Sequence, residues 1–180
     1  MLILTFGYFG KFYLSRNGVR KHTCGGTILT TYYVITAAHC FFNRTRENWR
    51  ILPVYKLDAE EGTFKVHTVA EIKCHESYTN GYQYDIAMVK VSEPFEKKEV
   101  KALHIPPTGT KPKDFERCQV AGWGETLALA LPMKLQFIEI PIQNIDKCKR
   151  NYIKSNASYE ERFYDGFLCA GSEGKDSCQV

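Results

Sequence analysis

The sequence predicts an all-β protein, built as a sandwich or a barrel. Short runs of β-branched and aromatic residues recur along the chain, and turn signals such as Asn17-Gly18 and Asn80-Gly81 separate them. Short strands at regular spacing with turns between them are typical of both architectures. No strong amphipathic helix accompanies the runs. The expected strands cover residues 32–36, 64–69, 86–91, 118–122 and 135–140.

Within this series, residues 64–69 alternate with period two, as a half-buried strand should. Residues 144–151 predict one short helix, with Asn144 as its N-terminal cap. Pro106-Pro107 opens the most linker-like segment, which runs to Lys113, so a boundary near residue 105 is expected. No internal repeat is evident.

The composition excludes several classes of protein. A chain of 180 residues fits one or two domains and can bury a substantial core. The net charge of +4 is spread over interspersed acids and bases, and the basic clusters at residues 97–98 and 147–150 are interrupted, so nucleic acid is not an expected partner. No apolar run reaches the roughly 18 residues of a membrane span. A membrane is therefore not expected either, and no complete secretory signal is visible.

The cysteines indicate an oxidising compartment. The chain has seven of them and no Cys-x-x-Cys pair, which makes a zinc site a weak interpretation. Distant disulfide pairing is the better account. Two glycosylation sequons, which begin at Asn43 and Asn156, agree with it. We therefore expect a secreted, extracellular protein.

Two segments carry residues suited to amide hydrolysis. Serine-based hydrolysis needs a nucleophile, a base that takes its proton, and an acid that holds the base in one tautomer. His39 lies in Thr-Ala-Ala-His-Cys, where small neighbours leave both ring nitrogens accessible. Asp85 opens Asp-Ile-Ala-Met-Val-Lys, at the start of an expected strand. Both segments closely resemble those of the trypsin-like serine proteases, which have the chymotrypsin fold. By that resemblance His39 is the general base and Asp85 accepts its Nδ1 proton.

Other blocks follow in the order of this family. They are residues 24–29, 122–124 and 167–171, and the resemblance extends from about residue 12 to residue 179. It implies two antiparallel six-stranded β-barrels with an active site in the cleft between them. Residues 1–105 would form the first barrel, with His39 and Asp85. Residues 106–180 would form an incomplete second barrel with the specificity-pocket segment, and both together one protease domain.

The resemblance also implies a substrate preference and a set of disulfides. Asp176, in Gly-Lys-Asp-Ser-Cys, matches the acid that pairs with a lysine or arginine side chain of the substrate. The alternative is a surface aspartate in a turn. The implied disulfides are Cys24–Cys40 and Cys148–Cys169. Cys118 and Cys178 match positions whose partners lie further along in the family, and Cys74 matches no common pair.

The chain departs from the family pattern after Gln179. The family continues there with Gly-Asp-Ser-Gly-Gly, whereas this sequence has Val180 and no nucleophilic serine. The backbone donors of the oxyanion hole belong to the same segment, and the family's Ile-Val-Gly-Gly start is absent as well. We therefore expect a chain truncated at both ends that is inactive alone.

These observations lead to one main hypothesis and two alternatives. The main one is a secreted trypsin-like endopeptidase that cleaves after lysine or arginine, with protein or peptide substrates and protease inhibitors as partners. No cofactor or metal is expected, since the acidic turn at Asp58, Glu60 and Glu61 is read as solvated, with calcium as the alternative. The first alternative is a non-catalytic homologue that acts as a secreted binding or regulatory module. The second, an unrelated disulfide-rich β-domain, would leave His39 and Asp85 out of hydrogen-bond reach.

Overall fold

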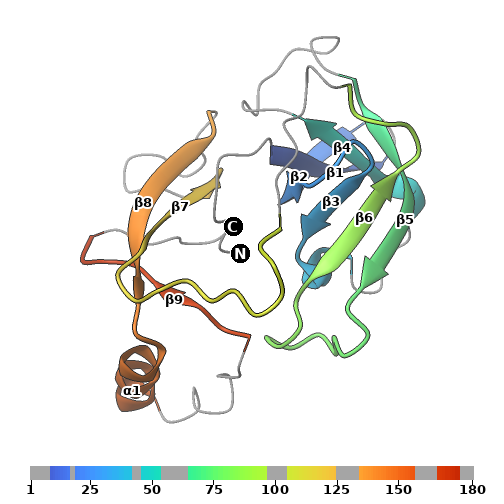
Figure 1. Ribbon diagram of the computed structural model, residues 1–180. Coiled ribbons are helices and arrows are strands. Elements are labelled where there is room, and N and C mark those ends of the chain that lie inside the picture. The colour runs from blue at the N-terminus through green and yellow to red at the C-terminus, as the bar shows by residue number, and fades with distance from the viewer. Residues whose placement is uncertain are drawn as a thin grey trace.

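The computed structural model confirms the all-β fold class. It describes residues 9–16, 19–41, 46–53, 65–96, 105–124, 134–156 and 166–174, and these residues hold nine strands, one α-helix and two short 3-10 helices. Strands β1 to β6 form one body and strands β7 to β9 form a second sheet beside it (Figure 1). Among the described residues, no helix has the length and apolarity that a membrane crossing requires.

The N-terminal half forms a closed antiparallel barrel in the order β1-β2-β3-β6-β5-β4. Closure follows from β1, which pairs with β2 on one side and with β4 on the other. This agrees with the first six-stranded barrel that the family resemblance implies. The strands are β1 (Phe9–Arg16), β2 (Val19–Ile28), β3 (Tyr33–Thr36), β4 (Trp49–Pro53), β5 (His67–Cys74) and β6 (Ala87–Val91).

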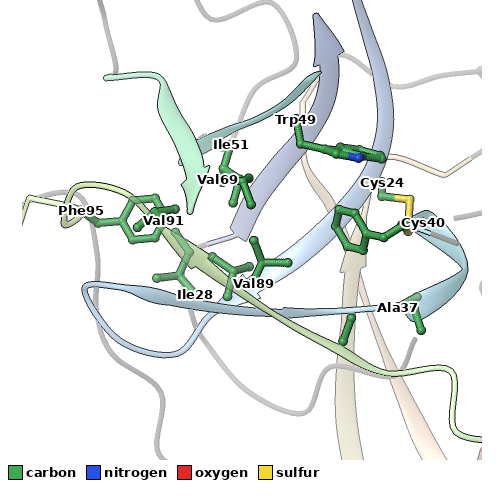
Figure 2. Packing of buried hydrophobic residues seen from close by; sticks show 14 residues of the cluster. Cys24, Ile28, Ala37, Cys40, Trp49, Ile51, Val69, Val89, Val91 and Phe95 are labelled. Atoms are coloured by element: carbon green, nitrogen blue, oxygen red, sulfur yellow. A yellow bond between two sulfur atoms is a disulfide. The ribbon is translucent and has the colours of Figure 1, made fainter. Parts of the chain in front are cut away.

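Alternating side chains fill the barrel. In β6, Ala87, Val89 and Val91 are buried, while Met88 and Lys90 between them are not. Trp49 and Ile51 of β4 reach the same interior, where Val89 and Val91 meet Phe95 (Figure 2). Each such side chain contributes about 1.5–3 kcal/mol by leaving water. The barrel interior is therefore a packed core that holds the loops at its rim.

Strand β5 differs from its sequence pattern. The expected strand covered residues 64–69, but β5 begins at His67 and runs to Cys74. Its register shifts between Val69 and Glu71, so an extra residue interrupts the alternation there. Beyond this bulge, Ile72 and Cys74 pack against the core. A period-two reading ends at such a bulge, which explains the shortened prediction.

The C-terminal half contributes a three-stranded sheet in the order β7-β8-β9, within the residues that the structure describes. Its strands are β7 (Arg117–Gly122), β8 (Gln136–Gln143) and β9 (Cys169–Ala170). A small cluster of Cys118, Val120, Ile140 and Ile142 forms its core. The described segment 105–116 contains no strand or helix, and the domain boundary at residue 105 stays a prediction.

Helix α1 (Ile145–Ser155) follows β8 and confirms the predicted helix and its cap. The Asn144 side chain accepts a hydrogen bond from the Lys147 backbone amide at 3.1 Å. The helix continues past the predicted end at residue 151, and the Asn156 amide bonds the Tyr152 carbonyl to close its last turn. The cap residue was visible in the sequence, whereas the end was not, because no glycine or proline marks it.

Candidate catalytic site

His39 projects from a short 3-10 helix that follows β3. Strand β3 ends at Thr36, whose hydroxyl donates to the Gly25 carbonyl of β2 at 2.7 Å. The 3-10 helix covers Ala38–Cys40, and in it Ala38 is fully buried while the His39 side chain is 53% exposed. A residue larger than alanine at position 38 would not fit beneath the turn. The small neighbours of His39 therefore let the backbone sit on the core while the ring faces outward.

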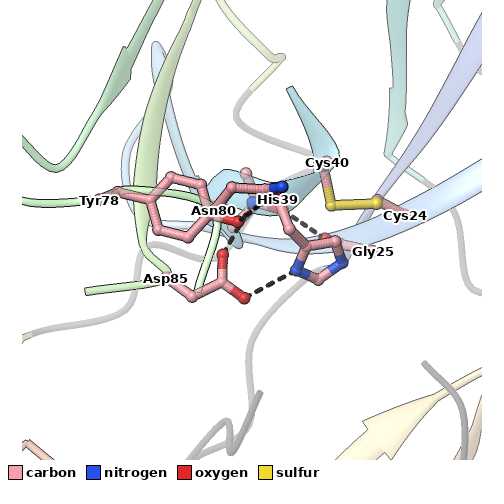
Figure 3. Close-up of polar contacts among 8 residues, drawn as sticks. Cys24, Gly25, His39, Cys40, Tyr78, Asn80 and Asp85 are labelled. Atoms are coloured by element: carbon pink, nitrogen blue, oxygen red, sulfur yellow. Dashed lines mark hydrogen bonds and ion pairs between the residues drawn. A yellow bond between two sulfur atoms is a disulfide. The ribbon is translucent and has the colours of Figure 1, made fainter. Parts of the chain in front are cut away.

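A disulfide fixes this turn to the barrel. Cys24 of β2 is joined to Cys40, with a Cα–Cα distance of 6.4 Å. The two cysteines are separated by 16 positions in the sequence. Closing a loop of about 15 residues lowers the entropy of the unfolded chain, which stabilises the folded state by roughly 3 kcal/mol. Figure 3 shows the bond close to the His39 ring, above it in that view. Together with the Thr36 hydroxyl, the disulfide attaches both sides of the turn to β2.

Asp85 occupies the centre of a tight turn at the start of β6. The Ile86 amide donates to the Tyr84 carbonyl at 2.7 Å, which closes a three-residue turn around Asp85. Tyr84 has a φ of 57°, in the left-handed region that costs an ordinary residue about 1–2 kcal/mol. The His75 amide bonds the Ile86 carbonyl at 2.9 Å and ties this turn to the end of β5. The Asp85 backbone is thus held from both sides.

The structure brings His39 and Asp85 together. The Asp85 Oδ2 atom lies 2.7 Å from His39 Nδ1, and Oδ1 accepts the His39 backbone amide, also at 2.7 Å (Figure 3). An ionised carboxylate can only accept hydrogen bonds, so Nδ1 carries the proton. The Nε2 lone pair is then available to take a proton from another group. Coincidental placement of two unrelated residues, which the unrelated-domain alternative requires, does not account for a two-point contact.

Two neutral side chains lie near the Asp85 carboxylate. Burial raises the pKa of the Cys74 thiol above its ordinary value, and the negative charge of Asp85 raises it further. The pKa of Tyr78 is raised by burial first and by Asp85 second. Both residues are partly buried and pack against the barrel core. Within the described part of the chain Cys74 has no disulfide partner, and its raised pKa disfavours the reactive thiolate.

One group of potential metal ligands lies at this site. The ligand atoms of Cys24, His39 and Cys40 are all within 4.8 Å of one another. Metal binding by cysteine uses the thiolate, which these two sulfur atoms cannot supply while they are bonded to each other. In the disulfide form, this group is therefore a structural link and not a metal site.

A second disulfide among the described residues lies at the second sheet. Cys148 of α1 is joined to Cys169 of β9 with a Cα–Cα distance of 6.4 Å. Gly171 follows β9, where its amide bonds the Pro141 carbonyl at 3.0 Å and its carbonyl accepts the Gln143 side chain at 2.8 Å. The segment 166–174 is thereby held against β8. Asp176 and Cys178 come shortly after it and lie outside the described residues.

Cys118 is the remaining cysteine that the structure describes. It is 4% exposed, and its thiol contacts the Ile140 carbonyl at 3.2 Å. Burial raises its pKa, so it behaves as an apolar core residue. It has no disulfide partner within the described part of the chain.

Sequence reasoning missed two contributions to the site. The first is the His39 backbone amide as a second donor to Asp85, and the second is the left-handed Tyr84 with the His75 ring packed on it. A tyrosine at positive φ leaves no signal in a sequence, because glycine, asparagine and aspartate are the residues that usually mark that conformation. Neither contribution could be found without coordinates.

Comparison with known proteins gives one consistent family. The family model described as Trypsin matches residues 4–179. Hypodermin-A of Hypoderma lineatum is 31% identical over 170 residues, which cover 92% of this chain and 62% of that protein. Cationic trypsin-3 of Rattus norvegicus is 31% identical over 168 residues, covering 88% and 62%. Trypsin eta of Drosophila melanogaster is 35% identical over 163 residues, covering 87% and 59%. The chain thus spans about three fifths of the length of these relatives.

Proposed function

Because this chain belongs to the trypsin family of serine proteases, we propose that it supplies the base, the orienting acid and the pocket acid of a secreted endopeptidase that cleaves after lysine or arginine. The observation that carries the proposal is the two-point contact of Asp85 with His39.

The proposed roles follow from the tautomer that this contact selects. His39 Nε2 takes the proton of a serine hydroxyl as that oxygen attacks the scissile carbonyl, and later returns a proton to the leaving amine. Asp85 holds the Nδ1–H tautomer and stabilises the imidazolium that forms in between. The His39 side chain is about half exposed, at 53%, so a substrate has access to it from solvent.

Substrate preference is assigned to Asp176. The support is the sequence around it, Gly-Lys-Asp-Ser-Cys, which resembles the pocket segment of the family. A carboxylate at the base of a desolvated slot would form a charge-assisted hydrogen bond with a lysine or arginine side chain. Protein and peptide substrates with these residues, and protease inhibitors that present them, are the proposed partners.

The proposal that the protein is secreted is supported by its disulfides. Two of them are formed among the described residues, Cys24–Cys40 and Cys148–Cys169. Structural disulfides persist in oxidising compartments and are rare in the cytosol.

A polypeptide of these 180 residues alone should not turn over substrate. Val180 stands after Gln179, so no serine follows Cys178 within them. Loss of the nucleophile costs about 10⁶-fold in kcat in a serine protease, which leaves His39 with no hydroxyl to activate.

The experiment compares two polypeptides on peptide amides of lysine, arginine and leucine. One is the 180-residue chain. The other is a chimera in which residues 1–179 are followed by the corresponding C-terminal part of cationic trypsin-3, with a cleavable start. We expect turnover of the lysine and arginine substrates by the chimera only. His39→Ala in the chimera should abolish turnover, and Asp176→Ser should remove the preference for basic residues.

A folded chimera without turnover, or one that His39→Ala leaves active, would refute the proposal. The second candidate function is a non-catalytic binding or regulatory module. It predicts that the 180-residue chain is secreted, folded and monodisperse by itself, and that the chimera gains no activity.

A further inference from the structure

The turn that presents Asp85 is supported by two stacked aromatic rings. The rings of His75 and Tyr84 lie with centroids 4.7 Å apart and an interplanar angle of 19°. We propose that His75 and Tyr84 are positioning residues: their stack holds Tyr84 in the left-handed conformation that aims the Asp85 carboxylate at His39. The effect of this stack on catalysis rests on the function proposed above.

The first step concerns Tyr84. Its φ of 57° is unfavourable for a residue with a Cβ atom, and its side chain is on the surface, with 39% exposed. An exposed tyrosine keeps such a conformation only where its surroundings compensate for the cost. A parallel ring at 4.7 Å supplies favourable contact of that kind.

The second step concerns His75, which is itself held in place. Its Nδ1 atom accepts a hydrogen bond from the Ser77 amide at 3.1 Å, and its carbonyl accepts one from the Tyr78 amide at 2.9 Å. Its own amide donates to the Ile86 carbonyl at 2.9 Å. One of these bonds is made by the ring itself, and the other two fix the backbone of His75, so the ring is held in place. It offers a rigid surface against which Tyr84 can rest.

The third step connects the stack to Asp85. Tyr84 precedes Asp85 directly, and the Tyr84 carbonyl accepts the Ile86 amide across it at 2.7 Å. The φ of Tyr84 thus determines the direction in which the chain enters the turn. A change of that angle would rotate the turn and move both carboxylate oxygens, which now lie 2.7 Å from their two His39 partners. Displacements of about 1 Å at such a site can cost roughly 100-fold in rate.

The test uses the 180-residue chain and does not require the catalytic nucleophile. With ¹⁵N-labelled histidine, the His39 Nδ1–H proton is observed by NMR as a resonance shifted downfield by its hydrogen bond to the carboxylate. Its exchange with solvent reports how firmly Asp85 is held. His75→Gln and Tyr84→Ala remove the stack, and alanine keeps the Cβ atom that makes a positive φ unfavourable. We expect exchange to accelerate about tenfold in both, the factor that weakening of one hydrogen bond to a charged group supplies.

Three variants serve as controls. His75→Phe and Tyr84→Phe keep an aromatic ring at each position and should retain the parent exchange rate. Tyr32→Ala removes a tyrosine that directly precedes β3 and has the same exposed fraction as Tyr84, 39%. It should also leave the exchange rate unchanged. If loss of any surface tyrosine were enough to accelerate exchange of the His39 Nδ1–H proton, Tyr32→Ala would accelerate it as much as the Tyr84 variant.

The outcomes separate the possibilities. Parent exchange rates in folded His75→Gln and Tyr84→Ala would overturn the proposal, and so would accelerated exchange in His75→Phe, which retains the ring. Unfolding of His75→Gln with a native His75→Phe would support it, because the ring would then be required for the turn itself. Failure of the proteolytic function appears separately as an inactive chimera, and the NMR measurement does not depend on it.

Discussion

Asp85 receives two hydrogen bonds from His39, one from the backbone amide to Oδ1 and one from ring Nδ1 to Oδ2, each 2.7 Å long. The carboxylate therefore fixes the backbone and the ring of the same residue together. This joint fixation restricts rotation of the imidazole and selects its tautomer.

Asp85→Asn should reverse the tautomer with little change in geometry. The asparagine Oδ1 can still accept the His39 amide, but its NH₂ group would face Nδ1, which must then accept a hydrogen bond. The proton moves to Nε2 and the base loses its lone pair. We expect kcat of the chimera to fall by about 10⁴-fold, as for the same change in a serine protease triad.

Two measurements check this prediction. Steady-state kinetics of the chimera gives the fall in kcat, with the exposed Asp146→Asn of α1 as the matched control. NMR of the 180-residue chain should show that the proton of the neutral His39 ring has moved from Nδ1 to Nε2. A normal kcat in Asp85→Asn would mean that Asp85 does not orient the base.

Removing the Cys24–Cys40 disulfide should destabilise the barrel by about 2–4 kcal/mol, because the unfolded chain regains the freedom of the loop that the bond closes. The double variant Cys24→Ala/Cys40→Ala is compared with Cys74→Ala in urea unfolding. Cys74 has no disulfide partner among the described residues, so its replacement leaves the disulfide constraint on the unfolded chain unchanged. Equal unfolding midpoints for the two variants would contradict the prediction.

Ile28→Ala should lower the free energy of unfolding by about 2–5 kcal/mol. Ile28 is 0% exposed in the barrel core, so its truncation removes apolar contacts and leaves a cavity. Ile105→Ala is the control with the same chemical change at a position that is 66% exposed, where an effect within about 0.5 kcal/mol is expected. Chemical denaturation of both variants measures the difference, and similar values would place Ile28 outside the core.

The pKa of Glu93 should lie below that of an ordinary glutamate. The hydrogen bond from Lys65, and then the positive charge of Lys65, lower the pKa of Glu93 in the folded protein. A lowered folded-state pKa means that the stabilisation is present above the unfolded value near 4.5 and is lost as pH falls through the folded value. Carboxyl ¹³C NMR should show the Glu93 midpoint rising in Lys65→Met. A midpoint that Lys65→Met does not move would show that Lys65 is not the cause.

Local sequence patterns marked several of the strands and the helix. Short β-type runs between turn signals marked β3, β6 and β7, and Asn144 marked the start of α1, because strand patterns and helix capping depend on neighbours along the chain. The motifs around His39 and Asp85 identified a pair of candidates by resemblance. The roles of these residues, and that of Asp176, stay predictions.

Only the tertiary structure decided how the site is held. The register shift in β5, the amide of His39 as a second donor, and the stack of His75 on Tyr84 depend on contacts between residues distant in sequence or on an unfavourable backbone angle. No local pattern specifies such features, because their cost is offset by neighbours that folding alone brings together. The sequence thus determined which groups could perform the chemistry, and closure of the barrel decided that His39 and Asp85 meet at 2.7 Å.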